Sequence, residues 1–473
     1  MSRLVVVSNR VADPRKTAAG GLAVALAEVL NNTGGLWFGW SGKIIEPSED
    51  GTAKDPTLHS HQAGPVKLVT VDLNRDDHDA YYLGYSNGVL WPVFHYRLDL
   101  ADFDAGYIAG YRRVNQLFAR KLAPLLREDD IIWVHDYHLI PLAAELRALG
   151  CTQRIGFFLH IPLPPPLILA AIPGHDWLIR ALFAYDLVGF QSNADHSHFS
   201  SYVQTEAHAQ NLGEGRWRAF NRTVQAGAFP IGIDVAEFAG LAASPQVKQR
   251  VADIRAGLGA EKLILGVDRL DYSKGILERL QAIDVLLEKR PELRRQFVFL
   301  QVAVPSRTQV KEYGELKRRI DEMVGRVNGR HGTANWQPVR YLYRGLPRHE
   351  LVACYRAADV CLVTPLRDGM NLVAMEYVAC RDDLDGVLVL SELTGAAREL
   401  GRGAVQVNPF AIHETADSLA HALAMPPEDR RERMTLLREC VASCDVHGWL
   451  ERILKAAVGE GSRPLPRRRT RLA

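Results

Sequence analysis

The sequence predicts an α/β protein with two doubly wound domains, each a parallel sheet covered by helices on both faces. Short apolar runs of strand length alternate with helical patterns along most of the chain, an order typical of parallel sheets. The 473 residues are too many for one ordinary hydrophobic core and suit two domains. The hydrophobic content of 47% and the charged content of 24% are those of a globular protein.

In the first half, apolar runs predict strands and periodic patterns predict helices. The strands are expected over Leu4–Ser8, Val66–Val71, Ile131–His135, Arg154–His160 and Leu187–Gln191. The helices are expected over Gly21–Leu30, Ala105–Leu126 and Leu139–Leu149. The segment Phe229–Asp234 closes this series, so we place the domain boundary near residue 235.

The second half repeats the alternation after a polar helical stretch, Ser244–Gly257. Strands are expected over Lys262–Asp268, Phe297–Val304, Val339–Leu342, Val360–Thr364, Val387–Leu390 and Val405–Val407, and helices over Thr308–Gly325 and Asn371–Ala379. We therefore expect domains at 1–235 and 236–460 and a basic tail at 461–473. Two such domains predict a cleft between them, with ligands at the carboxyl ends of the strands.

Charge and cysteine content narrow the possible partners and the compartment. The net charge of +2 gives no bulk electrostatic case for nucleic acid or a membrane surface. The tail from Arg463 to Arg471 holds five arginines and no acid, which is typical of a solvated terminus, although a polyanion contact is an alternative. Six scattered cysteines without a C-x-x-C pair predict a reducing compartment. With no signal peptide or membrane-length apolar run, we expect a cytoplasmic protein.

The stretch Arg269–Gly275 predicts an anion site. It lies between an apolar strand and a helical pattern, so that Arg269, Lys274 and a glycine share a strand-to-helix turn. Free N–H groups and the dipole of a helix N-terminus favour anions at such turns. Surface ion pairing is the alternative for two isolated cations. Because the cations lie at a strand end and a glycine follows, we favour a site for the diphosphate of a nucleotide sugar.

A second candidate turn, Asp368–Asn371, follows another predicted strand and opens a helix. Asp368 can accept hydrogen bonds from vicinal sugar hydroxyls, and Glu376, two turns later, can bind a ribose. The alternative is that Asp368 only caps the helix, which is a common use of aspartate. Capping leaves Glu376 and the glycine at position 369 unexplained, so we favour ligand binding.

Three strand ends of the first domain carry further candidates. Arg10 follows the first strand and precedes Gly20-Gly21, a glycine turn without the full G-x-G-x-x-G pattern, so we interpret Arg10 as a phosphate ligand. In His135-Asp136-Tyr137-His138 the spacing supplies no third fixed zinc ligand, and Asp136 is better interpreted as a sugar-hydroxyl acceptor. His160 ends the next strand, and beside Asp136 we expect it to contact a sugar.

Two motif matches do not support function. Gly84–Gly88 fits the G-x-S-x-G pattern of hydrolases, but the following Val89–Pro92 is expected to be extended and broken by proline, whereas the hydrolase elbow needs a helix there. Asp102-Phe103-Asp104 fits a D-x-D metal pattern, but its place before a long helix favours capping or solvation.

The chain resembles a known enzyme family along almost its whole length. The resemblance rests on Leu4–Arg10, Gly20–Leu22, Leu36–Trp40, Leu90–Tyr96, His135–His138, Phe158–Pro162, Arg269–Gly275 and Thr364–Tyr377. These segments are similar to those of trehalose-6-phosphate synthases of the bacterial OtsA type, which are retaining glycosyltransferases of family 20 with the GT-B fold. No second, phosphatase-like domain follows, so the resemblance implies a synthase alone.

The resemblance implies a role for each candidate residue. The catalytic set would be Asp136, His160, Arg269, Lys274 and Asp368. The donor site would comprise Gly20, Gly21, Arg269, Lys274, Leu346, Asp368, Leu372, Val373, Ala374, Met375 and Glu376. The acceptor site would comprise Arg10, Tyr82, Asp136 and Arg307, and Trp91 with Ile161 would select the acceptor anomer. Met375 stands where the family often has Lys, and Leu346 where it often has an aromatic residue, which leaves the preferred nucleotide base open.

Arg307 follows the predicted strand Phe297–Val304, so it too lies at a strand end. With Arg10 and Tyr82 it would bind the phosphate of glucose 6-phosphate and bridge the domains. The alternative is an ion pair with a nearby acid such as Glu312.

The resemblance implies transfer of glucose from a nucleoside diphosphate, UDP above all, to glucose 6-phosphate with retention, giving α,α-trehalose 6-phosphate. No cofactor is expected and no metal is expected to be essential. The expected partners are these small molecules and further copies of the chain, as a dimer or tetramer, with no nucleic acid and no membrane. The alternatives are a relative with another acceptor, such as a glucosylglycerol-phosphate synthase or a pseudo-glycosyltransferase, a non-catalytic sugar-phosphate sensor, and an epimerase of the same fold.

Overall fold

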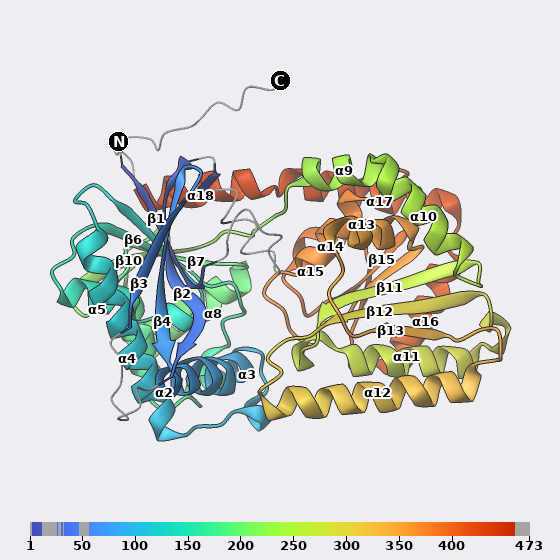
Figure 1. The fold of residues 1–473 in the computed structure, drawn as a ribbon, viewed down its shortest axis with the longest axis horizontal. Coiled ribbons are helices and arrows are strands. Elements are labelled where there is room, and N and C mark those ends of the chain that lie inside the picture. Colours follow the sequence, from blue (N-terminus) through green and yellow to red (C-terminus); the bar gives the residue numbers. More distant parts are fainter. Residues whose placement is uncertain (1, 12–25, 27–29, 32, 47–55, 459–473) are drawn as a thin grey trace. The chain divides into compact units, whose positions relative to one another are not determined.

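The structure, a computed structural model, describes residues 2–11, 26, 30, 31, 33–46 and 56–458. It divides into two compact units. One contains the residues up to Pro230 together with those from His447 on, and the other spans Ile231–Val446. Each unit is described by itself below (Figure 1).

The first unit is built on a ten-stranded sheet in the order β3-β4-β2-β1-β5-β6-β7-β10-β9-β8. The strands from β4 to β10 in this order run parallel, and β3 and the β9–β8 pair add antiparallel edges. The strands are β1 (Leu4–Arg10), β2 (Gly35–Ile45), β3 (Leu58–Ala63), β4 (Val66–Asn74), β5 (Ile131–His135), β6 (Arg154–Phe158), β7 (Leu187–Phe190), β8 (Gln210–Asn211), β9 (Arg216–Ala219) and β10 (Arg222–Ala228).

Helices connect these strands and cover both faces of the sheet, with α4 and α5 on one side and α8 on the other (Figure 1). The described helices are α2 (Arg75–Asp77), the π-helix η1 (His78–Leu90), α3 (Trp91–Phe94), η2 (Leu98–Leu100), α4 (Ala105–Leu122), η3 (Ala123–Leu125), η4 (Tyr137–Leu139), α5 (Leu142–Ala148), α6 (Pro166–Leu169), α7 (His175–Leu182), α8 (Asn193–Thr205) and α18 (Val446–Val458).

The second unit contains a six-stranded sheet in the order β13-β12-β11-β14-β15-β16, in which every pair is parallel. Numbered along the chain this is the order 3-2-1-4-5-6 of the doubly wound dinucleotide-binding fold. The strands are β11 (Lys262–Arg269), β12 (Phe297–Val304), β13 (Val339–Leu342), β14 (Val360–Val363), β15 (Val387–Ser391) and β16 (Val405–Val407).

The helices of the second unit lie on both faces of its sheet, with α11 and α12 on one side and α13 and α14 on the other (Figure 1). They are α9 (Val235–Ala243), α10 (Pro245–Ala256), η5 (Tyr272–Lys274), α11 (Ile276–Lys289), η6 (Pro291–Leu293), α12 (Lys311–His331), α13 (Arg348–Ala357), α14 (Leu372–Ala379), α15 (Ala396–Leu400), α16 (Ile412–Ala424) and α17 (Pro427–Ser443). Among the described residues, no helix combines the length and the apolar character that spanning a membrane requires.

The predicted α/β class with parallel sheets is confirmed, and four predicted strands keep their bounds: β5, β12, β13 and β16. The sequence did not predict β2, β3, β8, β9 or β10. In β2 and β10 the runs mix apolar with glycine and polar residues. The expectation of an extended Val89–Pro92 is wrong, because this segment joins η1 to α3, where Pro92 occupies an early helical position that tolerates proline. No strand precedes Ser86 directly, and its side chain is buried, so the hydrolase elbow stays excluded.

The C-terminal helix differs from the expected domain division. Residues 236–460 were expected to form one domain, whereas α18 belongs to the first unit from His447 on. The reason is Trp449, which is fully buried against Trp133 and Phe158 at ring-centre distances of 5.2 and 5.3 Å. Its indole N–H also donates to the carbonyl of Phe229 at 3.0 Å. Burial of this large aromatic surface outweighs the sequence proximity of α18 to α17.

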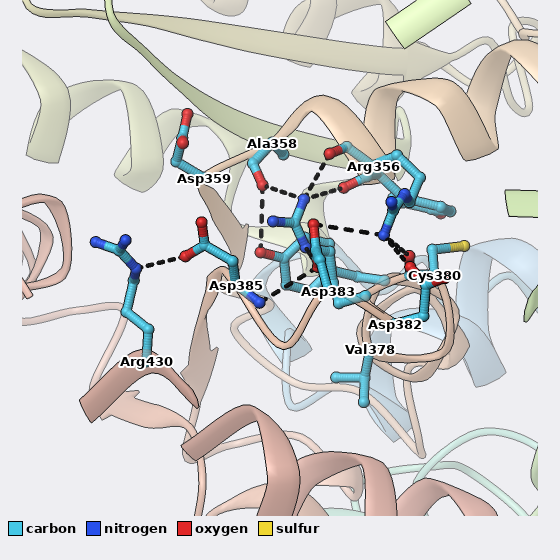
Figure 2. Close-up of polar contacts among 12 residues, drawn as sticks. Arg356, Ala358, Asp359, Val378, Cys380, Asp382, Asp383, Asp385 and Arg430 are labelled. Carbon is cyan, nitrogen blue, oxygen red and sulfur yellow. Dashed lines mark hydrogen bonds and ion pairs between the residues drawn. The ribbon is translucent and has the colours of Figure 1, made fainter. Parts of the chain in front are cut away.

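Ion pairs and hydrogen bonds of a cluster of arginines and carboxylates hold the loop between α14 and β15 in place (Figure 2). Arg356 pairs with Asp382, and Arg430 pairs with Asp385 at 2.6 Å. The buried guanidinium of Arg381 donates to the carbonyls of Arg356 and Ala358 at 2.5 and 3.0 Å. This loop enters β15, so the cluster lies at the amino ends of the strands, opposite the carboxyl ends that carry the candidate site. Its arginines therefore serve the fold.

Candidate functional site

The candidate site of the second unit lies at the point where its strand order reverses, between β11 and β14. Ligands bind at this position in doubly wound sheets. The loops after the two strands are joined, since Leu366 N–H donates to the carbonyl of Ser273 at 2.7 Å. Gly275 has φ +66°, and a Cβ at this residue would lie 2.1 Å from the Thr364 carbonyl oxygen, so only glycine allows this approach.

Lys274 and Asp368, both expected in the donor site, meet in this structure. Lys274 Nζ donates to Asp368 Oδ2 at 2.6 Å, and Asn371 Nδ2 donates to the same oxygen at 3.1 Å. The Lys274 and Asp368 side chains are only 11% and 14% exposed. Arg269 ends β11 with an exposed side chain. The turn thus combines cations that suit a diphosphate with a carboxylate that can accept hydrogen bonds from hydroxyls.

Asn371, not Asp368, caps α14. Its side-chain oxygen accepts from Ala374 N–H at 3.3 Å, and its backbone is left-handed with φ 89°. The alternative that Asp368 caps this helix is therefore wrong. The capped end presents the first N–H groups of α14, where Leu372 and Val373 are half-buried and Ala374 is fully buried.

Glu376 lies on the second turn of α14, half-buried, and accepts a hydrogen bond from the hydroxyl of Tyr355 at 2.7 Å. Burial raises the pKa of Glu376 to about 7, against the opposing effects of the Tyr355 hydrogen bond and of Arg348. A carboxyl group that changes charge near neutral pH is typical of functional sites.

Arg307 is held by a partner that the sequence did not suggest. Its guanidinium donates to Asp271 Oδ2 at 2.8 Å, and the hydroxyl of Tyr313 donates to the same oxygen at 2.8 Å. The Arg307 side chain is 6% exposed and that of Asp271 is fully buried. The alternative of an ion pair with an acid is thus present, with Asp271 as the acid. Because Asp271 lies two residues after Arg269, Arg307 is fixed close to the turn Arg269–Gly275, which is called the anion turn below.

In the first unit, too, candidate residues lie where the strand order reverses, between β1 and β5. Arg10 ends β1 and Asp136 follows β5, which pairs with β1. Asp136 Oδ1 accepts from the backbone N–H of His160 at 3.2 Å, so these two predicted residues lie together. Asp136 has φ 77°, a conformation found disproportionately at functional sites.

His160 forms a chain of side-chain contacts with its neighbours. Its Nε2 lies 3.0 Å from His135 Nδ1, and its Nδ1 lies 3.4 Å from the Gln191 amide nitrogen. Burial lowers the pKa of His160 and also that of His135, where the neighbouring His160 adds to the effect. The lowered pKa values favour the neutral form of both rings, which suits hydrogen bonding to a sugar.

Tyr82 and Arg10 lie against an aromatic group. Tyr82 stacks on His138 at 5.9 Å and lies 5.7 Å from Trp40, and the Arg10 guanidinium lies 5.8 Å from the Trp40 ring centre. Gly42 leaves room for Arg10, since a Cβ there would lie 2.6 Å from its guanidinium nitrogen. Tyr82 is part of the π-helix η1, a geometry that is frequent at functional sites.

Trp91 and Ile161 are both buried, at 4% and 6% exposure. Trp91 packs on His95 at 4.1 Å and on Tyr137 at 5.7 Å, so its ring is fixed beside the Asp136 segment. Ile161 follows His160 directly. Both are placed to shape the surroundings of Asp136 and His160.

The remaining predicted residues fall into three groups. Leu346 is half-exposed in the loop between β13 and α13, whereas Met375 is fully buried, so its side chain belongs to the core. Asp104 caps α4 through Gly106 N–H at 2.7 Å, as the capping interpretation expected. Gly20, Gly21 and the tail 461–473 lie outside the described residues.

Within the described ranges, no three His, Cys, Asp or Glu side chains gather in a way that could hold a metal ion.

Sequence reasoning missed the residues that contact the candidate site residues and hold them in position. These are Trp40, His135 as the partner of His160, Asp271, Tyr313 and Tyr355. Asp271 belongs to the anion-turn segment, and its early position in that turn was the only available signal. Trp40 and His135 lie in segments named in the sequence analysis, but without a role of their own there. Tyr313 and Tyr355 lie in ordinary helix patterns, which do not show their later neighbours.

Comparison with known proteins identifies one family along nearly the whole chain. The family model described as Glycosyltransferase family 20 matches residues 5–458. The chain is 46% identical over 468 residues to a trehalose-6-phosphate synthase of Sinorhizobium fredii, an alignment that covers 98% of this chain and 100% of the relative.

Solved structures agree with the sequence comparison. An α,α-trehalose-phosphate synthase (UDP-forming) from Burkholderia xenovorans in complex with glucose-6-phosphate superposes with a TM-score of 0.92 at 45% identity, covering 97% of this chain and 100% of that one. An Escherichia coli structure described as trehalose-6-phosphate bound with UDP-2-fluoro glucose superposes with a TM-score of 0.89 at 42% identity, covering 96% and 99%.

Proposed function

The chain belongs to glycosyltransferase family 20, and from this premise we propose that it transfers glucose from UDP-glucose to glucose 6-phosphate with retention. The products are UDP and α,α-trehalose 6-phosphate. The proposal rests chiefly on relatives with this activity, which align with nearly the whole chain. The Lys274–Asp368 pair at the strand reversal of the second unit is consistent with the same activity. The GT-B fold with its two doubly wound sheets supports the same function.

On the donor side, Arg269 and Lys274 bind the diphosphate. Asp368 binds glucose hydroxyls, Glu376 binds the ribose, and Leu372–Met375 contribute the amino-terminal turn of α14. Leu346 borders the base. The hydrogen bond from Lys274 to Asp368 supports this assignment, because it fixes a cation and a hydroxyl acceptor side by side before the donor binds.

On the acceptor side, Arg10, Tyr82 and Arg307 bind the phosphate of glucose 6-phosphate, and Asp136 binds its hydroxyls. Neutral His160 contacts the sugar through hydrogen bonding. Trp91 and Ile161 select the acceptor anomer. The fixed positions of Arg307 by Asp271 and of Asp136 by His160 N–H support these roles.

The reaction needs positioning and electrostatic stabilisation. The bond between the glucose anomeric carbon and the diphosphate breaks first, and Arg269 with Lys274 stabilises the charge on the departing UDP. The acceptor hydroxyl attacks the same face of the glucosyl cation, and its proton passes to the phosphate oxygen that has just left. No carboxylate nucleophile is required, in contrast to retaining glycosidases.

A substrate panel tests the proposal. UDP-, ADP-, GDP- and TDP-glucose are each offered with and without glucose 6-phosphate, and the disaccharide product is identified by NMR. UDP release only in the presence of acceptor, with an α,α-linked product, supports the proposal. Donor binding without turnover indicates a sensor, turnover without acceptor indicates an epimerase, and a different acceptor indicates a relative of other specificity.

We predict that turnover needs no metal ion. The two cations and the amino-terminal end of α14 take the part that a divalent cation plays in other nucleotide-sugar enzymes. After exhaustive treatment with EDTA, the rate should stay within about twofold of that of the untreated enzyme. Loss of most activity, with recovery on adding magnesium or manganese, contradicts this prediction.

We predict that ribose binding strengthens as the pH rises through about 7, the pKa of Glu376. The ionised carboxylate is the stronger hydrogen-bond acceptor. Uridine, which has no phosphate that titrates in this range, should bind more tightly at pH 8 than at pH 6, and Glu376→Gln should abolish this difference. Equal uridine dissociation constants for the wild type at both pH values contradict the assignment.

The same group predicts the opposite trend for stability. A raised carboxyl pKa means that the folded state binds the proton more tightly than the unfolded state, whose pKa is near 4.5. The contribution of Glu376 to stability is therefore largest below pH 4.5 and declines as the pH rises from there to about 7. Glu376→Gln should remove this decline, on the order of 1 kcal/mol after allowing for partial exposure of the side chain, measured by urea unfolding at pH 5 and pH 8.

A further inference from the structure

A buried ion pair lies directly beneath the anion turn. Arg279 is on the first turn of α11, and its side chain is fully buried. Its Nη1 donates to Asp268 Oδ2 at 2.7 Å, and Asp268 is 3% exposed. Burial raises the pKa of Asp268, and the neighbouring guanidinium opposes this effect. The charge of Arg279 is thus compensated inside the protein.

The remaining donors of Arg279 reach three other segments. Nε donates to Thr364 Oγ1 at 3.1 Å, Nη1 to the side-chain oxygen of Gln301 at 2.7 Å, and Nη2 to the carbonyl of Lys274 at 3.4 Å. Asp268 and Gln301 lie on β11 and β12, and Thr364 follows β14. One planar guanidinium therefore connects three neighbouring strands with the turn that carries Lys274.

The backbone makes room for this group. A Cβ on Gly266 would lie 2.4 Å from Arg279 Nη1 and 2.5 Å from the Gln301 side-chain oxygen. A glycine in a buried strand weakens the strand, and a buried ion pair often stabilises no more than an apolar replacement would. Fold stability alone therefore does not account for this arrangement.

We propose that Arg279 is a positioning residue for the donor diphosphate. It fixes the backbone of Lys274 through the carbonyl and the start of the Thr364–Asp368 loop through Thr364. These two segments carry the cation and the carboxylate that meet at 2.6 Å. The inference rests on the proposed function, because it assumes that the turn binds the diphosphate of the donor. Lysine cannot replace arginine here, since one ammonium group cannot reach four acceptors in a planar array.

The test compares Arg279→Lys with Arg381→Lys. Arg381 is the matched control, since it is another buried arginine of the second unit but holds the loop at the opposite ends of the strands. The measured quantities are kcat, the dissociation constants of UDP and of uridine, and Tm. Arg279→Lys should lower kcat and UDP affinity about 10- to 100-fold, by analogy with the residues that orient metal-binding side chains, and leave uridine affinity within about twofold. Arg381→Lys should lower Tm and leave the ratio of UDP to uridine affinity unchanged.

Four outcomes decide the matter. A folded Arg279→Lys protein with the wild-type ratio of UDP to uridine affinity overturns the inference, as does an equal change of that ratio in Arg381→Lys. If Arg279→Lys does not fold, Thr364→Val, which removes one acceptor at nearly constant volume, decides instead. It should lower the ratio several-fold, and no change overturns the inference. Absence of UDP binding or turnover in the wild type refutes the proposed function itself, independently of the variants.

Discussion

Lys274→Ala and Arg269→Ala are each expected to lower kcat by about 10²-fold or more, with smaller changes in the KM for UDP-glucose. Negative charge on the diphosphate grows as the glycosidic bond breaks, so a fixed cation is worth more in the transition state than in the ground state. For Lys274 a second effect adds to the first. Its removal leaves Asp368, 14% exposed, without the ammonium group that lies 2.6 Å away.

Lys289→Ala is the matched control for the lysine variant. Lys289 lies on α11, the helix that begins just after Lys274, and pairs with exposed Asp417 at 2.9 Å. We expect wild-type kcat for this variant, because an exposed ion pair contributes little. Circular dichroism and thermal unfolding establish that each variant is folded. Near-wild-type kcat in a folded Lys274→Ala or Arg269→Ala protein contradicts the role of that residue.

Arg307→Ala is expected to raise the KM for glucose 6-phosphate by roughly 10- to 100-fold, and to leave UDP binding nearly intact. The estimate follows from the 1.5–3 kcal/mol that hydrogen bonds to charged groups typically contribute. Arginine suits the task because its planar fork can bind two phosphate oxygens. The variant should also reduce the preference for glucose 6-phosphate over free glucose by a similar factor, since only the phosphorylated acceptor uses the side chain.

Two further variants sharpen this prediction. Arg318→Ala removes an exposed arginine of α12 that pairs with Glu315, and it should leave both acceptor constants unchanged. Tyr313→Phe removes the hydroxyl that donates to Asp271 and should raise the KM for glucose 6-phosphate by a smaller factor, because Arg307 loses part of its support. If the wild type uses free glucose as well as glucose 6-phosphate, or if Arg307→Ala keeps the wild-type preference, the acceptor assignment is wrong.

Local patterns in the sequence determined the fold class and the places where function was sought. Strand-length apolar runs and helical periods depend on the nearest residues, so they gave β5, β12, β13 and β16 their bounds. In a parallel sheet the carboxyl ends of the strands share one edge. Polar residues at those ends, such as Asp136, Lys274 and Asp368, could therefore be singled out before their neighbours were known.

Contacts between distant parts of the chain were decided by the tertiary structure alone. Arg307 pairs with Asp271, 36 residues away, whereas proximity in the sequence had suggested Glu312. Lys274 meets Asp368 across 94 residues. Trp449 brings α18 back to the first unit, and Arg279 joins three strands from an ordinary helix pattern. Such pairings depend on which strands become neighbours and which side chains are buried together. A local sequence pattern shows neither the order of the strands nor the buried neighbours of a side chain, because both depend on how the whole core packs.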